Sequence, residues 1–300
     1  MSSAEEVRIK GTVLMLDAPE RLQFGVDWME WTVASRFAGV KLIPFGAHFC
    51  FTRRHDSPGA EAQGFWLWVP SNGEGVCEVR RFEAAGEEFV PVGGDEGERL
   101  AAAVRRMEFD GRLGPYAQQA DRADWARCTR HIDEAHVQWL RRRPAGVPYG
   151  DVLPKRAKTL DRSLELQSLE DRGTNVLGLM ESCFVEFSLV HSLAAFELWR
   201  DVVLLMCGCV NALRTRTRLF QDFAHVLAWQ LETAGIDVLW TDNDRSKGGG
   251  NVLVKAVSEF VADIQDDPDL AALHESVEKL TQVVPVLEVD DEDEPVVVDI

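Results

Sequence analysis

The stretch FGVDWMEWTVASRFAGVKLIPFGAHF, residues 24–49, is dense in aromatic residues and glycines. Its aromatic and β-branched residues lie between turn residues every few positions, a pattern typical of short strands joined by tight turns. No group of acids, bases and nucleophiles accompanies the rings. The stretch therefore predicts a packed β scaffold or a docking surface rather than a reactive pocket.

The strand-like pattern extends outward from this stretch, from residue 11 to about residue 91. Residues 12–16 predict a buried strand. Residues 64–70 and 76–80 flank the turn sequence SNGEG and predict a β-hairpin. Residues 95–108 then predict a helix, and residues 120–141 predict a second one.

A proline- and glycine-rich segment, RPAGVPYG at residues 143–150, marks a linker, and helical patterns follow it as far as residue 282. We therefore predict an α+β multidomain protein. A β-rich N-terminal domain with two helices at its end occupies residues 1–155, and an all-α domain occupies residues 156–285. Residues 286–300 form an acidic, extended C-terminal tail.

Charge is distributed unevenly along the chain, whose net charge is −18. Residues 1–155 hold 20 Lys and Arg against 23 Asp and Glu, whereas residues 156–300 hold 12 against 27. Because the acidic half repels a phosphate backbone, we expect protein partners and no direct binding of nucleic acid.

The chain shows no secretion signal and no membrane span. Its first residues, MSSAEEVRIK, lack an apolar segment, and the apolar run at 202–210 is far shorter than the roughly 20 residues of a spanning helix. We therefore expect no membrane association, a cytoplasmic or nuclear protein, and reduced thiols at its six cysteines. These are Cys50, Cys77, Cys128, Cys183, Cys207 and Cys209.

Candidate metal and anion sites fall short of the required spacings. Cys207 and Cys209 lie about 200° apart on a helix, so their sulfurs cannot readily chelate one ion. His131 and His136 lack the spacing of a zinc pair, and the segment that begins at His274 is not HExxH. The KGGGN sequence at 247–251 lacks the rest of a phosphate-binding loop. We predict no catalytic residue, no metal site and no cofactor.

Two alternatives stay open. His48 and Cys50 alternate onto one strand face, so His48 with Asp27 could line the pocket of an enzyme or a small-molecule-binding protein. The arginines at 141–143 and at 214, 216 and 218 could contact phosphate or an acidic protein surface, although helix C-termini and solvation explain most such clusters.

The aromatic stretch and a series of further motifs together resemble the A1-cistron-splicing factor (Aar-two) family, in that family's order and over nearly the whole chain. The matching motifs are Gly11-Thr12-Val13, Phe24-Gly25-Val26-Asp27, Trp31, Phe37-x-Gly39-Val40-Lys41-x-Ile43-Pro44-x-Gly46-x-His48-Phe49, Gly64-Phe65, Leu113-Gly114-Pro115-Tyr116, Trp125, Asp151-Val152-Leu153-Pro154, Ala194-Ala195-Phe196-Glu197-x-Trp199-Arg200 and Pro295-Val296-Val297-Val298. The segment after Pro154 is shorter than in the family.

This resemblance implies a β-rich domain followed by a helical domain similar to a VHS module. It also implies a non-catalytic assembly factor of the U5 snRNP, present in cytoplasm and nucleus. Such a factor binds the large spliceosomal scaffold protein through its RNase H-like and Jab/MPN domains and keeps the U5 helicase away. The C-terminal tail, with Pro295, Val296, Val297, Val298 and Ile300, would add as a strand to that partner. A helical trafficking-type adaptor is a further alternative, suggested by the helical half alone.

Overall fold

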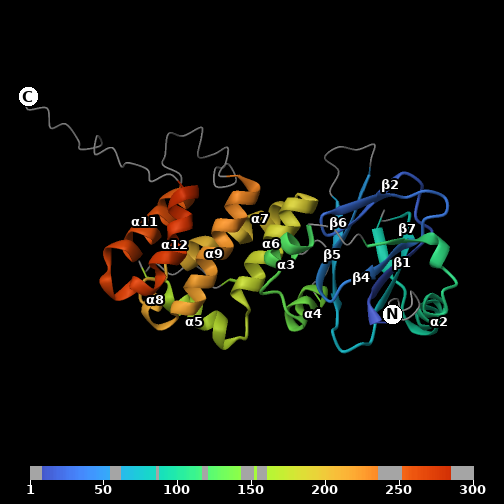
Figure 1. The fold of residues 1–300 in the computed structure, drawn as a ribbon, viewed down its shortest axis with the longest axis horizontal. Helices are drawn as coiled ribbons and strands as arrows, with labels where there is room; N and C mark the ends of the chain where they lie inside the picture. Colours follow the sequence, from blue (N-terminus) through green and yellow to red (C-terminus); the bar gives the residue numbers. More distant parts are fainter. Residues whose placement is uncertain are drawn as a thin grey trace, which may run out of the picture. The chain divides into compact units, whose positions relative to one another are not determined.

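The computed structural model describes residues 9–54, 62–85, 88–116, 121–142, 152–153, 161–235 and 252–284 (Figure 1). The chain divides into two units by its contacts. Unit 1 comprises Met1–Gly150 with Asn175–Trp199, and unit 2 comprises Asp151–Thr174 with Arg200–Ile300. This division by contacts places residues 175–199 with the first half of the chain. The domain boundary that the sequence predicts between residues 155 and 156 stays a prediction.

Unit 1 contains a five-stranded sheet, called sheet A, with the strand order β8-β7-β1-β4-β9. Strand β1 pairs antiparallel with β4 and parallel with β7. The strands of sheet A are β1 (Gly11–Leu16), β4 (Gly39–Ile43), β7 (Cys77–Glu83), β8 (Glu88–Pro91) and β9 (Leu113–Pro115).

Sheet B, also in unit 1, has the order β3-β2-β5-β6, and its neighbouring strands are all antiparallel. The strands are β2 (Leu22–Val26), β3 (Met29–Thr32), β5 (Gly46–Arg54) and β6 (Gln63–Val69). The aromatic stretch at 24–49 thus supplies parts of both sheets, as its strand-and-turn pattern predicts.

One apolar core joins the two sheets. Val13 of β1 and Val40 of β4 pack in the same cluster as Phe24 of β2 and Leu67 of β6, and all four are fully buried. The opposite face of sheet A packs on α2 (Gly94–Arg105) through a second cluster that includes Leu14 and Val104. Phe24 and Phe49 of the aromatic stretch are buried, whereas its other large rings, Trp28, Trp31, Phe37 and Phe45, are half-buried or exposed. The stretch is therefore a packed scaffold that keeps some of its rings at the surface.

The predicted hairpin of residues 64–80 is wrong. β6 belongs to sheet B, whereas β7 belongs to sheet A and pairs with β1 and β8. The turn itself forms, since the side-chain oxygen of Asn72 accepts a hydrogen bond from the backbone N–H of Glu74 (2.9 Å). A turn signal specifies a change of direction but not the sheet in which the next strand pairs.

Two glycines make room for rings on the outer face of sheet B. A Cβ atom at Gly25 would lie 2.2 Å from the ring of Phe51, and one at Gly64 would lie 2.1 Å from the ring of Phe49. Phe51 pairs in register with Gly25 on one side and with Gly64 on the other. The stacked rings of Phe49 and Phe51, 6.3 Å apart, fill the space that the glycines leave.

The single helix predicted over residues 120–141 is instead two helices, α3 (Asp121–Cys128) and α4 (Glu134–Arg142). Asp133 starts α4, because its carboxylate accepts a hydrogen bond from the backbone N–H of His136 (2.7 Å), as an N-cap does. The Asp-Glu pair at 133–134 carries this signal in the sequence. The helix predicted at 95–108 is confirmed by α2 and is followed by a short 3-10 turn, η1 (Asp110–Arg112).

Helix α6 (Val176–Val190) packs on sheet B alongside α4, over β5 and β6 (Figure 1). Trp66 donates its ring N–H to the carboxylate of Glu186 (3.0 Å), and Arg53 donates to the carbonyl oxygen of Leu189 (2.7 Å). These contacts explain why residues 175–199 group with unit 1.

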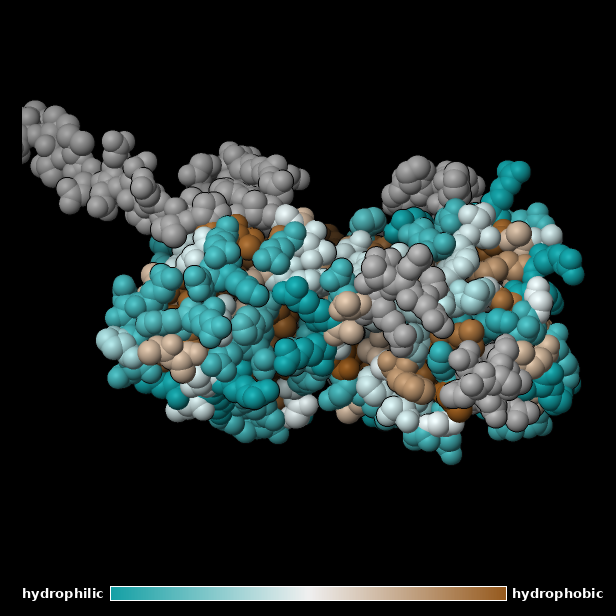
Figure 2. Space-filling model, in the orientation of Figure 1, coloured by the Kyte–Doolittle hydropathy of each residue, from teal (hydrophilic) through white to brown (hydrophobic). Residues whose placement is uncertain are grey.

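Unit 2 is helical in its described residues, as the sequence predicts. Phe223 of α9 and Phe260 of α11 meet edge to face, 5.5 Å apart, inside its core. Hydrophilic residues cover most of the face over α8, α11 and α12 in Figure 2. Helix α7 (Leu193–Cys207) belongs to unit 2 from Arg200 onward. The other elements of unit 2 are α5 (Ser163–Asp171), α8 (Ala212–Thr215), α9 (Thr217–Ala234), α11 (Val252–Asp266), η3 (Pro268–Leu270) and α12 (Ala271–Val283).

The β-rich first part and the helical second part confirm the predicted α+β class. Among the described residues, no helix combines the length and the apolar character that crossing a membrane requires. The predicted linker at 143–150, the KGGGN sequence and the tail at 286–300 lie outside the described residues.

Candidate functional site

Asp27 is the centre of a buried polar network in unit 1. It lies in the two-residue turn between β2 and β3 with a left-handed φ of 58°, which Asp tolerates better than most residues. Its carboxylate accepts hydrogen bonds from the backbone N–H of Phe49 (3.0 Å) and the hydroxyl of Tyr116 (2.7 Å). Its side chain is only 1% exposed, so the network is shielded from solvent.

His48 completes this network with both ring nitrogens. Nε2 lies 3.0 Å from the carbonyl oxygen of Pro44, and Nδ1 lies 2.6 Å from Oδ2 of Asp27. Because a carbonyl oxygen only accepts, Nε2 is the donor in the contact with Pro44, and Nδ1 is engaged by the carboxylate of Asp27. The structure thus joins His48 and Asp27 as the small-molecule alternative requires, but it uses their polar atoms internally.

An open pocket of about 330 Å³ lies beside the network. Its lining is mainly aromatic and aliphatic, with the exposed Arg130 and the buried His48 and Tyr116 as its ionisable groups. Phe45 lines the pocket and is exposed to solvent for 44% of its surface. No other described Phe or Trp of the aromatic stretch is as exposed. The main lining residues are Pro44, Phe45, Trp68, Trp125, Arg130 and Ile132.

His131 forms a second buried pair, with Glu181 of α6. The Glu181 carboxylate accepts from the His131 backbone N–H (2.7 Å) and lies 2.6 Å from its Nδ1. Burial raises the pKa of Glu181, against the opposing effect of His131. His136 contacts Ser182 instead, with 3.2 Å between Nε2 and Oγ. The two histidines thus attach the α3–α4 region to α6, and they do not form a common site.

The first arginine cluster is partly a structural contact. Arg141 donates to the carboxylate of Glu78 on β7 (2.9 Å), and Glu78 also accepts from Arg80 (3.0 Å). Arg143 lies outside the described residues, and Arg142 is exposed at the end of α4.

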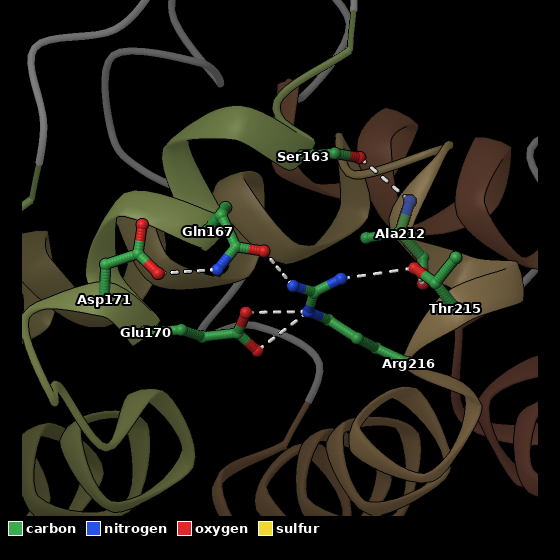
Figure 3. Close-up of polar contacts among 7 residues, drawn as sticks. All are labelled: Ser163, Gln167, Glu170, Asp171, Ala212, Thr215 and Arg216. Atoms are coloured by element: carbon green, nitrogen blue, oxygen red, sulfur yellow. Dashed lines mark hydrogen bonds and ion pairs between the residues drawn. The ribbon is translucent and has the colours of Figure 1, made fainter.

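The second arginine cluster forms ion pairs within unit 2. Figure 3 shows Arg216 between α5 and α9, where its Nε lies 2.7 Å from Oε2 of Glu170 and its guanidinium also contacts Gln167. Arg214 pairs with Asp267, and Arg218 lies 3.8 Å from the carboxylate of Asp222. All three arginines therefore face acids of their own unit, which favours the structural interpretation over phosphate binding.

The six cysteines are free thiols, and none forms part of a metal cluster among the described residues. Burial raises the pKa of Cys77 and of Cys209 to about 12 and raises that of Cys207 further. Because the thiolate is the reactive form, these groups are inert at neutral pH. Cys209 donates to the carbonyl oxygen of Leu205 (3.0 Å) and does not form a site with Cys207.

The sequence identified His48 and Asp27 but not the rest of this region. Tyr116 and Trp125 come from positions about 70 and 80 residues away, and only the fold brings them to β5. Both residues belong to motifs quoted from the sequence, Leu113-Gly114-Pro115-Tyr116 and Trp125, and those motifs were the available signal. The predicted partner-binding residues Pro295, Val296, Val297, Val298 and Ile300 lie outside the described residues.

Comparison with known proteins connects these features to one family. The family model described as the AAR2 N-terminal domain matches residues 9–142, and the model of the AAR2 C-terminal repeat region matches residues 155–286. The first match covers the sheets and the Asp27 network, and the second covers α5 to α12.

Relatives named protein AAR2 homolog align with different parts of the chain. The rabbit protein is 47% identical over 73% of this chain and 71% of its own length. The human protein is 32% identical over 48% of this chain, and the match spans only 38% of the human protein's length. The Caenorhabditis elegans protein is 22% identical over 85% of this chain and 86% of its own. With both halves matched in order, this chain belongs to the AAR2 family.

Proposed function

We propose that this protein is a non-catalytic assembly factor of the U5 snRNP that acts in pre-mRNA splicing by binding a protein partner. The observation that carries the proposal is the match to AAR2 family models over both halves of the chain. The partner is the large U5 scaffold protein, bound through its RNase H-like and Jab/MPN domains. While bound, the factor keeps the U5 helicase off that surface.

The absence of catalysis is supported by the state of the polar groups. Both ring nitrogens of His48 and both carboxylate oxygens of Asp27 have hydrogen-bond partners within unit 1. The raised pKa values of Cys77 and Cys209 keep their thiols protonated at neutral pH. A general base or nucleophile needs a free reactive atom within reach of a substrate.

The tail provides the proposed mechanism of binding. Residues 296–298 are three consecutive valines, which favour extended structure. An extended segment that adds to the edge of a partner sheet satisfies its N–H and C=O groups there, and alternate side chains give specificity. The acids at 290–294 direct the tail toward a basic groove.

Charge supports a protein partner rather than a nucleic acid. The chain carries a net charge of −18, and the arginines at 214, 216 and 218 face acids of unit 2. Contact with a phosphate backbone requires accessible basic side chains, each of which displaces counterions. We further propose that the protein is present in cytoplasm and nucleus, which imaging of a tagged chain would test.

Affinity purification from cell extract, followed by mass spectrometry, tests the proposal. The full chain should recover U5 components without the U5 helicase, and a chain ending at Val284 should lose them. Val297→Pro removes a backbone N–H and should weaken capture, whereas Val297→Thr keeps that N–H and should retain it. Undiminished capture by the shortened chain would refute strand addition, and recovery of no splicing component by the full chain would refute the function itself.

The two alternative functions have less support. An enzyme or small-molecule-binding protein acting at His48 requires polar groups that converge on a ligand, and those groups are already paired. A helical trafficking-type adaptor stays a prediction from the helical half, and the same purification would reveal it by recovering membrane-traffic proteins.

A further inference from the structure

We propose that the pocket beside Asp27 and Tyr116 is an anchor site for a segment of a partner protein. The segment inserts one large apolar side chain into the pocket and places a neighbouring acidic residue against Arg130. This inference concerns unit 1 alone and does not depend on the identity of the partner or on the C-terminal tail.

The pocket is held in shape by the network behind it. The ring N–H of Trp125 donates to the carbonyl oxygen of Ala47 (2.8 Å), and the Trp125 ring stacks on that of His48 at 6.5 Å. Trp28 meets Trp125 edge to face at 5.4 Å. Because these side chains are fixed by hydrogen bonds and ring contacts, an incoming group meets a preformed surface, which lowers the entropy cost of binding.

The polar atoms in the lining favour a protein anchor over a small molecule. His48 uses both ring nitrogens, Tyr116 donates to Asp27, and Thr129 donates to the carbonyl oxygen of Trp125 (2.9 Å). Small-molecule sites orient their ligand with a few polar groups that converge on it. Here the interior offers apolar contact, and the charge lies on an exposed side chain, as in the centre and rim of a protein interface.

Charge selects the flanking residue of the partner. Among the lining residues, Arg130 is the exposed charged side chain, and no acid lines the pocket. A segment with Asp or Glu next to its apolar anchor is complementary to this rim, and a basic one is repelled. The volume of about 330 Å³ suits one large side chain, since it is near the lower end of the range for ligand pockets.

The test uses the full chain labelled with ¹⁵N at its tryptophan ring nitrogens and followed by NMR. The probe is an acetylated, amidated pentapeptide with phenylalanine between two glutamates. Three further probes serve as comparisons: the same peptide with alanine at the centre, the peptide with lysines in place of the glutamates, and free phenylacetate. The expected result is millimolar or tighter binding of the first peptide, with shifts confined to the signals of Trp68, of Trp125 and of Trp28, which contacts Trp125.

Two pocket variants and two matched controls give the specificity. Phe45→Ala should weaken binding about tenfold or more, as loss of an interface aromatic does. Arg130→Glu should weaken it about two- to fivefold and should reverse the preference toward the lysine-flanked peptide. Trp139→Ala and Arg142→Glu alter an exposed aromatic residue and an exposed arginine outside the pocket lining, and should leave binding unchanged.

Several results would overturn the proposal. These are no binding of the glutamate–phenylalanine peptide at millimolar concentration, equal binding of the alanine-centred peptide, and shifts that spare Trp68 and Trp125. Binding of phenylacetate as tight as that of the peptide would assign the pocket to a small carboxylate instead.

Discussion

Two polar contacts, one from each unit, differ in burial and in the number of partners they have. In sheet B of unit 1, Asp27 and His48 are buried and bonded to each other, to the backbone and to Tyr116. In unit 2, the pair of Arg216 and Glu170 lies near the surface, with side chains 28% and 31% exposed. A polar group that looks functional in the sequence can thus be a core hydrogen-bonding centre in one unit and a weak surface contact in the other.

The first and largest expected effect is at Asp27. Asp27→Ala should destabilise the protein by about 3–5 kcal/mol, because it leaves His48, a backbone N–H and a tyrosine hydroxyl without their buried acceptor. Urea denaturation followed by tryptophan fluorescence measures the change. Glu30→Gln is the matched control, since Glu30 makes an exposed contact with Arg53 at 3.4 Å and should cost less than about 1 kcal/mol. Equal effects of the two substitutions would contradict the proposed difference between buried and exposed groups.

The second effect concerns packing in sheet B. Gly25→Ala places a methyl group against the Phe51 ring and should cost about 1–3 kcal/mol. Gly111→Ala has open space around its Cβ position and should change stability by no more than about 0.5 kcal/mol. Thermal unfolding of both variants checks this difference, and a Gly25→Ala protein as stable as the parent would show that the rings can move.

The third effect is a pH dependence at Glu181. Burial raises its pKa, so the folded protein binds this proton more tightly than the unfolded chain does. Its contribution is therefore full below the unfolded value of about 4.3 and is lost as pH rises through the folded pKa. Glu181→Gln can keep both contacts to His131, should change stability by about 1 kcal/mol, and should remove this loss. Denaturation curves of both proteins at several pH values would show it, and parallel pH profiles would refute it.

The smallest effect is in unit 2. Arg216→Ala should cost about 1 kcal/mol or less, because its ion pair is partly exposed to solvent. Arg218→Ala is the control, since that side chain is 85% exposed and 3.8 Å from its partner, and it should have no measurable effect. A double-mutant cycle between Arg216 and Glu170 gives the pair energy directly. A coupling above about 2 kcal/mol would mean that this partly exposed pair stabilises the protein as much as a buried one.

Much of the fold could be predicted from residue patterns. The apolar positions at helical spacing indicated α2, α9, α11 and α12, and the aromatic stretch indicated short strands. The hairpin at 64–80 was predicted wrongly because strand pairing depends on distant residues, here those of β1, and not on the turn between the strands. The break between α3 and α4 depended on one capping aspartate.

The candidate site could be predicted only in part. The alternation in β5 pointed to His48, but neither Tyr116, which donates to Asp27, nor the pocket wall at Trp125 is near it in sequence. For the arginine clusters, by contrast, the sequence showed the charged residues but not their partners. Their charge is obvious in the sequence, whereas the acids that pair with Arg141, Arg216 and Arg214, namely Glu78, Glu170 and Asp267, are 46 to 63 residues away from them.

The close contacts of Gly25 with the ring of Phe51 and of Gly64 with the ring of Phe49 also constrain how this family can evolve. A side chain at Gly25 is accommodated only when the ring of Phe51 becomes smaller, and one at Gly64 only when the ring of Phe49 does, so each glycine and its facing ring are expected to change together. Related sequences that have lost a glycine at 25 or 64 should therefore have a smaller residue in place of Phe51 or Phe49, and the two substitutions should appear together along the lineage.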